Sequence, residues 1–208
     1  MYSGCANLER ITIPASLTDI TSFPPMFFCR NCPNLKEIIF KSNATSLPSM
    51  ENTGILEFTF PSTVGLIANS LFAGCTELHK VNFNNVQITK LPQYIFKDCS
   101  SLRTVSLPQT ITTFESSTFA GSSIQSITIP SGVTNLGLYT FQDCIYLKEI
   151  HMLPTTPPTI SAGNNTYYNP FKNTHPNLII YVPVGCLSAY TSATNWSSFA
   201  SIIQEEST

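Results

Sequence analysis

One nine-residue pattern, Cys-x-x-Leu-x-x-Ile-x-Ile, recurs along most of this 208-residue chain. The five copies that keep the cysteine begin at Cys5, Cys32, Cys75, Cys99 and Cys144. In two further copies without the cysteine, Ile55 and Ile124 occupy the leucine position. The seven leucine positions recur at a mean interval of about 23 residues, a period typical of repeat architectures. Such regularity predicts a stack of similar units, each of which contacts only its neighbours.

The end of each unit predicts a strand with one buried face, because apolar residues alternate there with polar ones. One unit cannot bury that face alone, so neighbouring units stack and their strands form a parallel sheet. An aromatic position also recurs, without helical spacing around it, at Phe72, Phe96, Phe119, Phe141 and Phe171, with Met50 in one unit. We predict a β-rich repeat solenoid of leucine-rich repeat type, with a parallel sheet on one face, a second extended segment elsewhere in each turn, and little helix.

The regular pattern ends after Met152. Residues 1–153 are therefore predicted to form seven leucine-rich repeats, and residues 154–208 an atypical final repeat and a C-terminal cap. Trp196, Phe199 and Ile202 recur at helix-like spacing, which suits a last turn that covers the exposed end of the core. No comparable cap precedes Cys5, so we expect the chain to be an N-terminally truncated fragment.

The repeat resembles that of the BspA-like leucine-rich repeat family. Leu71-Phe72-Ala73-Gly74-Cys75 and Thr118-Phe119-Ala120-Gly121 match the end of that family's unit almost letter for letter. The resemblance implies a surface or secreted protein of the kind found in gut and oral anaerobic bacteria. It also implies adhesion, since some members of the family are implicated in attachment to host proteins or to other cells.

The composition limits the classes of partner. Charged residues make up only 11% of the chain, and ten Lys and Arg against twelve Asp and Glu give a net charge of −2. Such a chain lacks the basic face that nucleic-acid binding requires. No stretch reaches the length of apolar residues that a membrane helix needs, and no signal peptide opens the sequence. Serine and threonine supply 49 residues, which predicts a neutral, polar surface.

The seven cysteines are an odd number, which argues against a fully paired disulfide framework. Five of them recur at one position of the repeat, where a free cysteine packs as a small apolar residue. Cys29 and Cys32 form a Cys-x-x-Cys sequence, but neither a βαβ context nor a second pair accompanies it. Whether Cys29 and Cys32 form a local disulfide is left open, and no metal site is predicted.

Catalytic chemistry has little support in the sequence. His79, His151 and His175 are too dispersed along the repeats to share a metal ion. Glu37 and Glu57 are expected to be neighbours on the sheet, a superficial match to the carboxylate pair of glycoside hydrolases. Arg10 and Lys80 flank them, so a neutralising ladder of charges is the preferred interpretation. We predict that the chain is not an enzyme and that it binds no cofactor.

Two surfaces are candidate binding sites. The first is the outward side of the repeat strands, which offers hydrogen-bonding groups and few charges at Thr12, Thr59, Asn82, Ser106, Thr128 and His151. The second is the loop 161–170, where aromatic and amide groups suited to protein or sugar contacts occur together at Asn164, Asn165, Tyr167 and Tyr168.

The leading hypothesis for function is a non-catalytic binding or adhesion module of a bacterial surface or secreted protein. The expected partner is a host extracellular or cell-surface protein or glycan, with no nucleic acid and no membrane insertion in this segment. The alternative is a structural spacer, or a self-associating repeat array, that supports another domain. The sequence alone does not define the oligomeric state.

Overall fold

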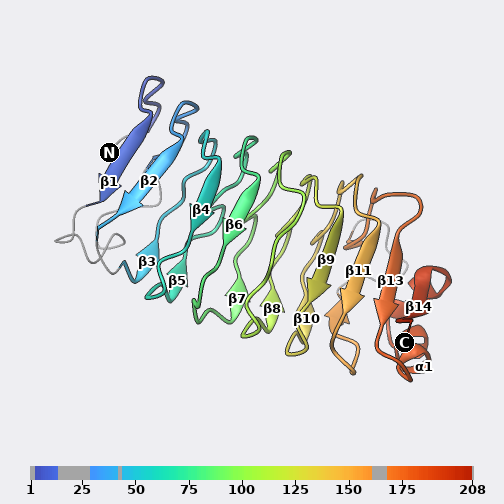
Figure 1. The fold of residues 1–208 in the computed structure, drawn as a ribbon. Helices are drawn as coiled ribbons and strands as arrows, with labels where there is room; N and C mark the ends of the chain where they lie inside the picture. Colours follow the sequence, from blue (N-terminus) through green and yellow to red (C-terminus); the bar gives the residue numbers. More distant parts are fainter. Residues whose placement is uncertain (1–2, 14–28, 42–43, 161–167, 208) are drawn as a thin grey trace.

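The computed structural model describes residues 3–13, 29–41, 44–160 and 168–207. The chain forms a parallel β-solenoid of about seven turns, with about 23 residues in each turn and 7% helix. Figure 1 shows the turns stacked in sequence order, with β1 (Arg10–Ile13) at one end and β14 (Ile203–Glu205) at the other. The predicted fold class is confirmed.

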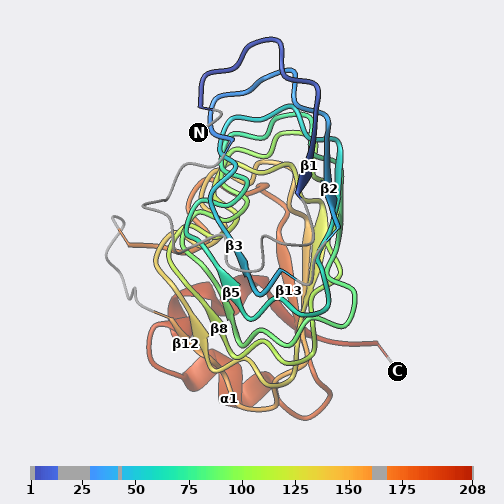
Figure 2. The ribbon, with the colours of Figure 1, turned by 90° about the vertical axis from the view of Figure 1, so that its left-hand side faces the viewer.

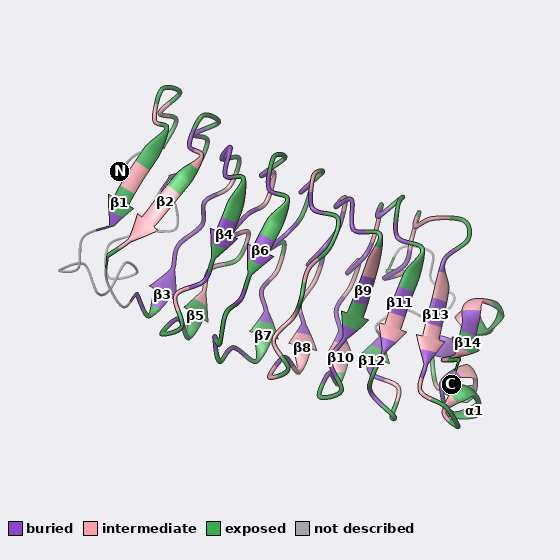
Figure 3. Ribbon diagram, in the orientation of Figure 1, coloured by how far each residue is buried: buried purple, intermediate pink, exposed green. Residues whose placement is uncertain are grey.

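The predicted strands line one side of the solenoid, and we call their outward surface the strand face. Between β1 and β14 this side carries β2 (Glu37–Phe40), β4 (Glu57–Thr59), β6 (Lys80–Asn82), β9 (Ser126–Ile129), β11 (Glu149–Met152) and β13 (Ile179–Val182). All of the pairs between them are parallel, and equivalent repeat positions face each other, as in Phe58 with Val81 and Ile127 with Ile150. Figure 3 shows the expected alternation of buried and exposed residues along β4 and β6.

The second extended segment of each turn forms short parallel ladders of its own. These strands are β3 (Ser46–Leu47), β5 (Leu66–Ile67), β7 (Lys90–Leu91), β8 (Thr113–Phe114), β10 (Asn135–Leu136) and β12 (Thr159–Ile160). Four of them make a continuous sheet in the order β12-β10-β8-β7. The end-on view of Figure 2 shows these strands and the strand face on different sides of the coil. The described turns therefore carry parallel strands on two sides, where the sequence predicted a sheet on one.

The aromatic position of the repeat forms a continuous stack through the core. The rings of Phe72, Phe96, Phe119, Phe141 and Phe171 follow one another with centroids 5.2–6.0 Å apart and interplanar angles of 6–22°. All five are buried, with at most 5% of their surface exposed. Offset stacking at this separation is favourable beyond the burial of apolar area. Each turn therefore packs through the same residue on the turns before and after it.

Two buried aromatic residues attach the C-terminal cap to the irregular segment that follows Met152. The cap consists of α1 (Leu187–Ser192), a 3₁₀ helix (Trp196–Ile202) and β14. The Tyr190 hydroxyl donates a hydrogen bond to the Pro154 carbonyl, and the Trp196 indole donates one to the Pro158 carbonyl, both at 2.7 Å. The helix-like spacing that begins at Trp196 is confirmed as the 3₁₀ helix, but β14, which pairs with β13, was not predicted.

One predicted strand is missing from the strand face. The repeat that begins at Cys99 places Thr104 and Ser106 on a strand between β6 and β9, but residues 102–108 contain no strand. Phe83 and Leu107 occupy the same inward position in successive units. Phe83 is buried, with 3% of its surface exposed, whereas Leu107 is only partly buried. The interruption therefore coincides with a change from a phenyl ring to a smaller side chain beneath the sheet.

Candidate functional site

The strand-face residues singled out from the sequence do lie in register. Thr59 pairs with Asn82 between β4 and β6, and Thr128 pairs with His151 between β9 and β11. Thr12 lies opposite Ile39 between β1 and β2. All of them except His151 and Ile39 are exposed. The polar column is therefore in register within each set of paired strands, but it falls into three parts, because β2 does not pair with β4 and no strand forms at Ser106.

A shallow hollow of about 290 Å³ lies beside β6, next to the segment without a strand. Its lining residues are His79, Lys80, Val81, Asn82, Phe83, Thr104, Val105 and Ser106. Across the described chain, no hydrogen bond connects the backbone of residues 104–106 to another residue. Backbone groups of this kind are strong donors and acceptors that need a partner from water or from a ligand. Asn82 and Ser106, two predicted site residues, lie together at this hollow.

His151 is in a different environment from the rest of its column. Its ring stacks on Tyr181 at 5.0 Å, and its Nδ1 lies 2.6 Å from the Glu206 carboxylate. Glu149 approaches Nε2 of the same ring at 3.5 Å. These contacts join the end of the chain to β11 and β13, so the structure gives His151 a role in holding the cap.

The charged residues of the strand face form the neutralising pairs that the sequence favoured. The Arg10 guanidinium lies 2.6 Å from Glu37, and Lys80 lies 3.3 Å from Glu57. Glu37 and Glu57 do not lie on paired strands, because β2 pairs with β1 and β4 pairs with β6. The expected adjacency of these two carboxylates in one ladder is therefore wrong. Each carboxylate instead forms an ion pair with a cation on the strand that it pairs with, Glu37 with Arg10 and Glu57 with Lys80.

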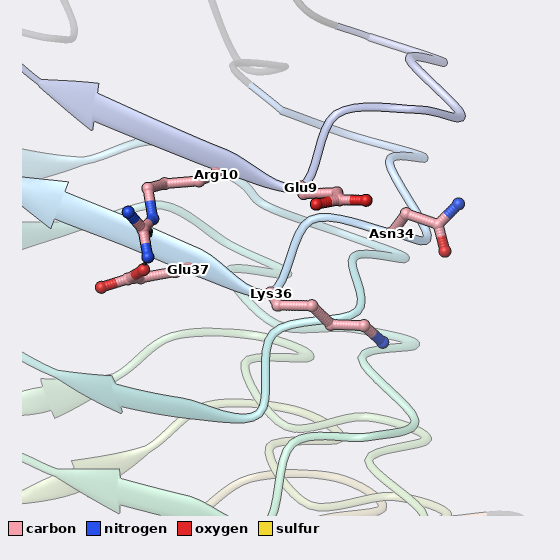
Figure 4. Close-up of a pocket in the computed structure, with 5 residues that line it drawn as sticks. All are labelled: Glu9, Arg10, Asn34, Lys36 and Glu37. Carbon is pink, nitrogen blue, oxygen red and sulfur yellow. Dashed lines mark ion pairs between the residues drawn. The ribbon is translucent and has the colours of Figure 1, made fainter.

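A larger hollow, about 450 Å³, lies at the start of β1 and β2 and was not anticipated from the sequence. Figure 4 shows its lining, Glu9, Arg10, Asn34, Lys36 and Glu37. Arg10 and Glu37 are paired with each other, and Lys36 reaches the Glu77 carboxylate at 2.5 Å. Charges that are already neutralised within the protein offer less to a ligand. We therefore do not assign this hollow as the principal site.

The cysteines serve the packing of the turns. Sγ of Cys99 donates to the Phe72 carbonyl at 3.2 Å, and Sγ of Cys144 donates to the Phe119 carbonyl at 3.0 Å, in each case in the preceding unit. Burial raises the pKa of Cys144 to about 12, which keeps the thiol protonated. The structural interpretation of this column is confirmed.

All seven cysteines are free thiols, including Cys29 and Cys32. Burial, followed by the neighbouring Cys32, raises the pKa of Cys29 to about 12, so this pair lacks the lowered pKa of a reactive Cys-x-x-Cys. Among the residues that the structure describes, no three His, Cys, Asp or Glu side chains are placed to hold a metal ion. No helix in the same residues is long and apolar enough to cross a membrane.

The predicted loop site lies mostly outside the described residues, since Asn164, Asn165 and Tyr167 fall in the range 161–167. Tyr168 is described and is 45% exposed. Its ring lies 6.2 Å from that of Tyr139, at an interplanar angle of 45°. The contact brings together an aromatic pair that the sequence did not predict, because Tyr139 lies one turn earlier.

The chain is similar to known leucine-rich repeat sequences and structures. The model of the BspA type leucine-rich repeat region, in six copies, matches residues 1–51 and 25–148. No curated protein sequence matches the chain.

Solved structures that are similar to this chain are also leucine-rich repeat proteins. A leucine-rich repeat protein from Bacteroides ovatus is 20% identical over 86% of this chain and 56% of its own, with a TM-score of 0.50. A leucine rich cell surface protein from Faecalibacterium prausnitzii is 25% identical over 74% of this chain and 41% of its own, with a TM-score of 0.52. The chain thus spans about half the length of these structures. With most of its length matched by the family's repeat and the solenoid in place, the chain belongs to the BspA-type leucine-rich repeat family.

Proposed function

We propose that this chain is a non-catalytic binding module of a bacterial surface or secreted protein, and that it recognises a protein or glycan on a host or on another cell. The observation that carries the proposal is the interruption of the strand face between β6 and β9. There, unpaired backbone groups of residues 104–106 meet the side chains of Asn82 and Ser106 at one hollow. A partner that supplies donors and acceptors at this place satisfies groups that otherwise hydrogen-bond only to water.

The neutral character of the strand face supports recognition rather than catalysis. One outward column of this face is rich in threonine, serine and asparagine, at Thr12, Thr59, Asn82, Ser106 and Thr128, whose desolvation costs less than that of charged groups. Glu37 and Glu57 on this face are paired with Arg10 and Lys80 on neighbouring strands. One solved relative is described as a cell surface protein, which supports a surface location for this chain as well.

The test is the binding of the purified chain to immobilised matrix proteins, mucin and glycans, measured by surface plasmon resonance. Ser106→Arg fills the hollow with a long charged side chain, and we expect it to weaken binding at least tenfold. Ser131→Arg is the matched control, because Ser131 is exposed and lies outside the strand face. Equal affinities of Ser106→Arg and Ser131→Arg would show that the hollow beside β6 is not the binding site. Binding lost instead in Tyr167→Ala and Tyr168→Ala would assign recognition to the loop 161–170.

The alternative function, a self-associating repeat array, draws support from the edge of β1. No described strand pairs with β1 except β2, so one side of its backbone is unpaired within the described residues. Such an edge is a template for another strand. Light scattering over a hundredfold range of concentration separates the two functions. The array would be favoured if the chain associates with itself, if Thr12→Pro abolishes that association, and if the monomer binds none of the tested partners.

A further inference from the structure

A second surface runs along the corner that follows the second set of strands. Four residues there, Ser70, Tyr94, Ser117 and Tyr139, occupy the same position in successive turns, and we call them the corner column. The backbone N–H groups of Ser70, Tyr94 and Ser117 each donate to the next turn, to the carbonyls of residues 93, 116 and 138, at 2.8–3.2 Å. The hydrogen bonds fix the alignment of the column across the stack.

Every member of the corner column has a left-handed backbone, with φ between 57° and 60°. This conformation is readily adopted by glycine, asparagine and aspartate, and it is unfavourable for bulky side chains. Tyr94 and Tyr139 are the two bulky members among the described left-handed residues, since the other non-glycine ones are Asn, Asp or Ser. A strained conformation that persists where a smaller residue would relieve it points to a role other than stability.

The residue three positions later varies in step with the corner column. In each turn its backbone N–H donates to the carbonyl of the column residue, at 3.1–3.3 Å. After Ser70 and Ser117 this companion is an alanine, at positions 73 and 120. After Tyr94 and Tyr139 it is a long polar residue, Lys97 or Gln142. Alternate turns therefore present either a small pair or an aromatic ring with a long hydrogen-bonding side chain.

Both aromatic turns are accessible at the surface. Tyr94 is 38% exposed, and the Lys97 ammonium lies 5.7 Å from its ring centroid. Tyr139 is half-buried and pairs with the exposed Tyr168. Because strands in a sheet are about 4.8 Å apart, the two aromatic turns repeat at a spacing of about 10 Å.

We propose that the corner column binds a neutral polysaccharide, with sugar rings stacked on Tyr94 and on the Tyr139–Tyr168 pair. A pyranose ring has an apolar C–H face that fits a tyrosine ring, and hydroxyl groups at its edge that Lys97 and Gln142 can reach. The regular recurrence of one ring and one polar group matches a polymer that presents the same unit at regular intervals. This surface is separate from the strand face and does not depend on the function proposed for it.

The test is affinity electrophoresis of the whole chain in native gels that contain soluble xylan, mannan, β-glucan or galactan, with gelatin as the protein alternative. We expect at least one polysaccharide to retard the wild-type chain. Tyr94→Asn and Tyr139→Asn should abolish the retardation. The same variants should keep or raise the melting temperature, because asparagine tolerates the left-handed backbone. Ser70→Asn is the matched control in the same column and should migrate as the wild type does.

Three outcomes would overturn the proposal. They are the absence of retardation by every polysaccharide, retardation by gelatin alone, and tyrosine variants that melt at lower temperature while they still bind. The last outcome would show that the rings stabilise the fold. Ser106→Arg distinguishes this site from the strand face, since retardation lost in that variant and kept in the tyrosine variants would place sugar binding at the hollow beside β6.

Discussion

At the scale of single residues, the repeat position marked by cysteine acts as a hydrogen-bond donor. Cys75 donates through Sγ to the Met50 carbonyl at 3.3 Å, as Cys99 and Cys144 do to the Phe72 and Phe119 carbonyls. The residue before the cysteine has a left-handed backbone in each of these units. In the two units that lack the cysteine, the residue at its place is Thr53 or Ser122. The Thr53 hydroxyl donates to the same Met50 carbonyl at 3.0 Å. This position thus carries a small side chain that can donate a hydrogen bond, through sulfur in Cys75 and through oxygen in Thr53.

The raised cysteine pKa values predict a loss of stability at alkaline pH. Burial raises the pKa of Cys75 to about 11 and that of Cys144 to about 12, from 9.0 for an ordinary thiol. Above pH 9 the unfolded chain releases thiol protons that the folded chain retains, so the free energy of unfolding falls as pH rises. Urea titrations at pH 8, 9 and 10 should show this fall. The double variant Cys75→Ser and Cys144→Ser should show a shallower fall, and an unchanged slope would contradict the assignment.

Gly54 offers a second test at the residue scale. A Cβ atom at this position would lie 2.0 Å from the Pro33 carbonyl oxygen, which belongs to the backbone of the preceding turn. Gly54→Ala should therefore lower the free energy of unfolding by about 2–4 kcal/mol, as overpacking against a rigid neighbour does. Gly65→Ala is the control, because a Cβ there meets no atom within 4 Å. Equal stability of Gly54→Ala and Gly65→Ala in urea would show that Gly54 lies farther from the Pro33 carbonyl than this structure places it.

At the scale of elements, the cap is fixed by two side-chain hydrogen bonds to the irregular segment that precedes it. Tyr190 and Trp196 reach the Pro154 and Pro158 carbonyls, and their rings meet edge to face at 5.2 Å. Trp196 also lies 6.0 Å from Phe171, the last ring of the stack. The cap therefore continues the aromatic core as well as covering its end.

Loss of either cap anchor should be measurable by thermal unfolding. Tyr190→Phe keeps the ring and leaves the buried Pro154 carbonyl without its side-chain donor, which should cost about 1–2 kcal/mol. Trp196→Ala removes a buried ring and should cost about 3–5 kcal/mol. For a domain of this size, each kcal/mol shifts Tm by about 2–4 °C. A Tm shift no larger for Trp196→Ala than for Tyr190→Phe would contradict a packing role for the indole.

At the scale of the whole molecule, the buried apolar residues that the structure describes form two clusters along the solenoid. One cluster runs from Leu47 to Ile203, and a separate small cluster joins Ile13, the two cysteines of the Cys-x-x-Cys sequence, Leu35 and Ala44. Ile38 and Phe40 pack against both clusters. Among the residues that the structure describes, the buried apolar side chains from Ile13 to Ala44 thus belong to the smaller cluster.

This division predicts uneven local stability. In hydrogen exchange followed by mass spectrometry, amides of β1 and β2 should exchange much faster than those of β9 and β11, because opening the terminal turns exposes the smaller cluster alone. Lys36→Ala should increase the difference further, since Lys36 bridges β2 to Glu77, which lies beyond the neighbouring turn. Uniform protection along the chain would instead indicate one cooperative core.

The repeat, the stacked phenylalanines and the buried cysteines were predictable because each depends on local periodicity that every unit repeats. The paired charges of the strand face followed from the same register. The missing strand at residues 104–106 was not predictable, since its sequence fits the repeat as well as the sequences of the neighbouring strands do. The hollow beside β6, the unpredicted β14 and the Tyr139–Tyr168 contact likewise join residues from different turns.

The sequence by itself determined the family, the solenoid and the length of its turn, because a short repeat with one buried face has few ways to stack. Only the tertiary structure decided where the stack is imperfect: which strand fails to pair, and which turns carry exposed rings on a left-handed backbone. Those features depend on side-chain volume and on contacts between turns, and a pattern read one unit at a time does not contain them. The candidate sites of this protein lie at these irregular places.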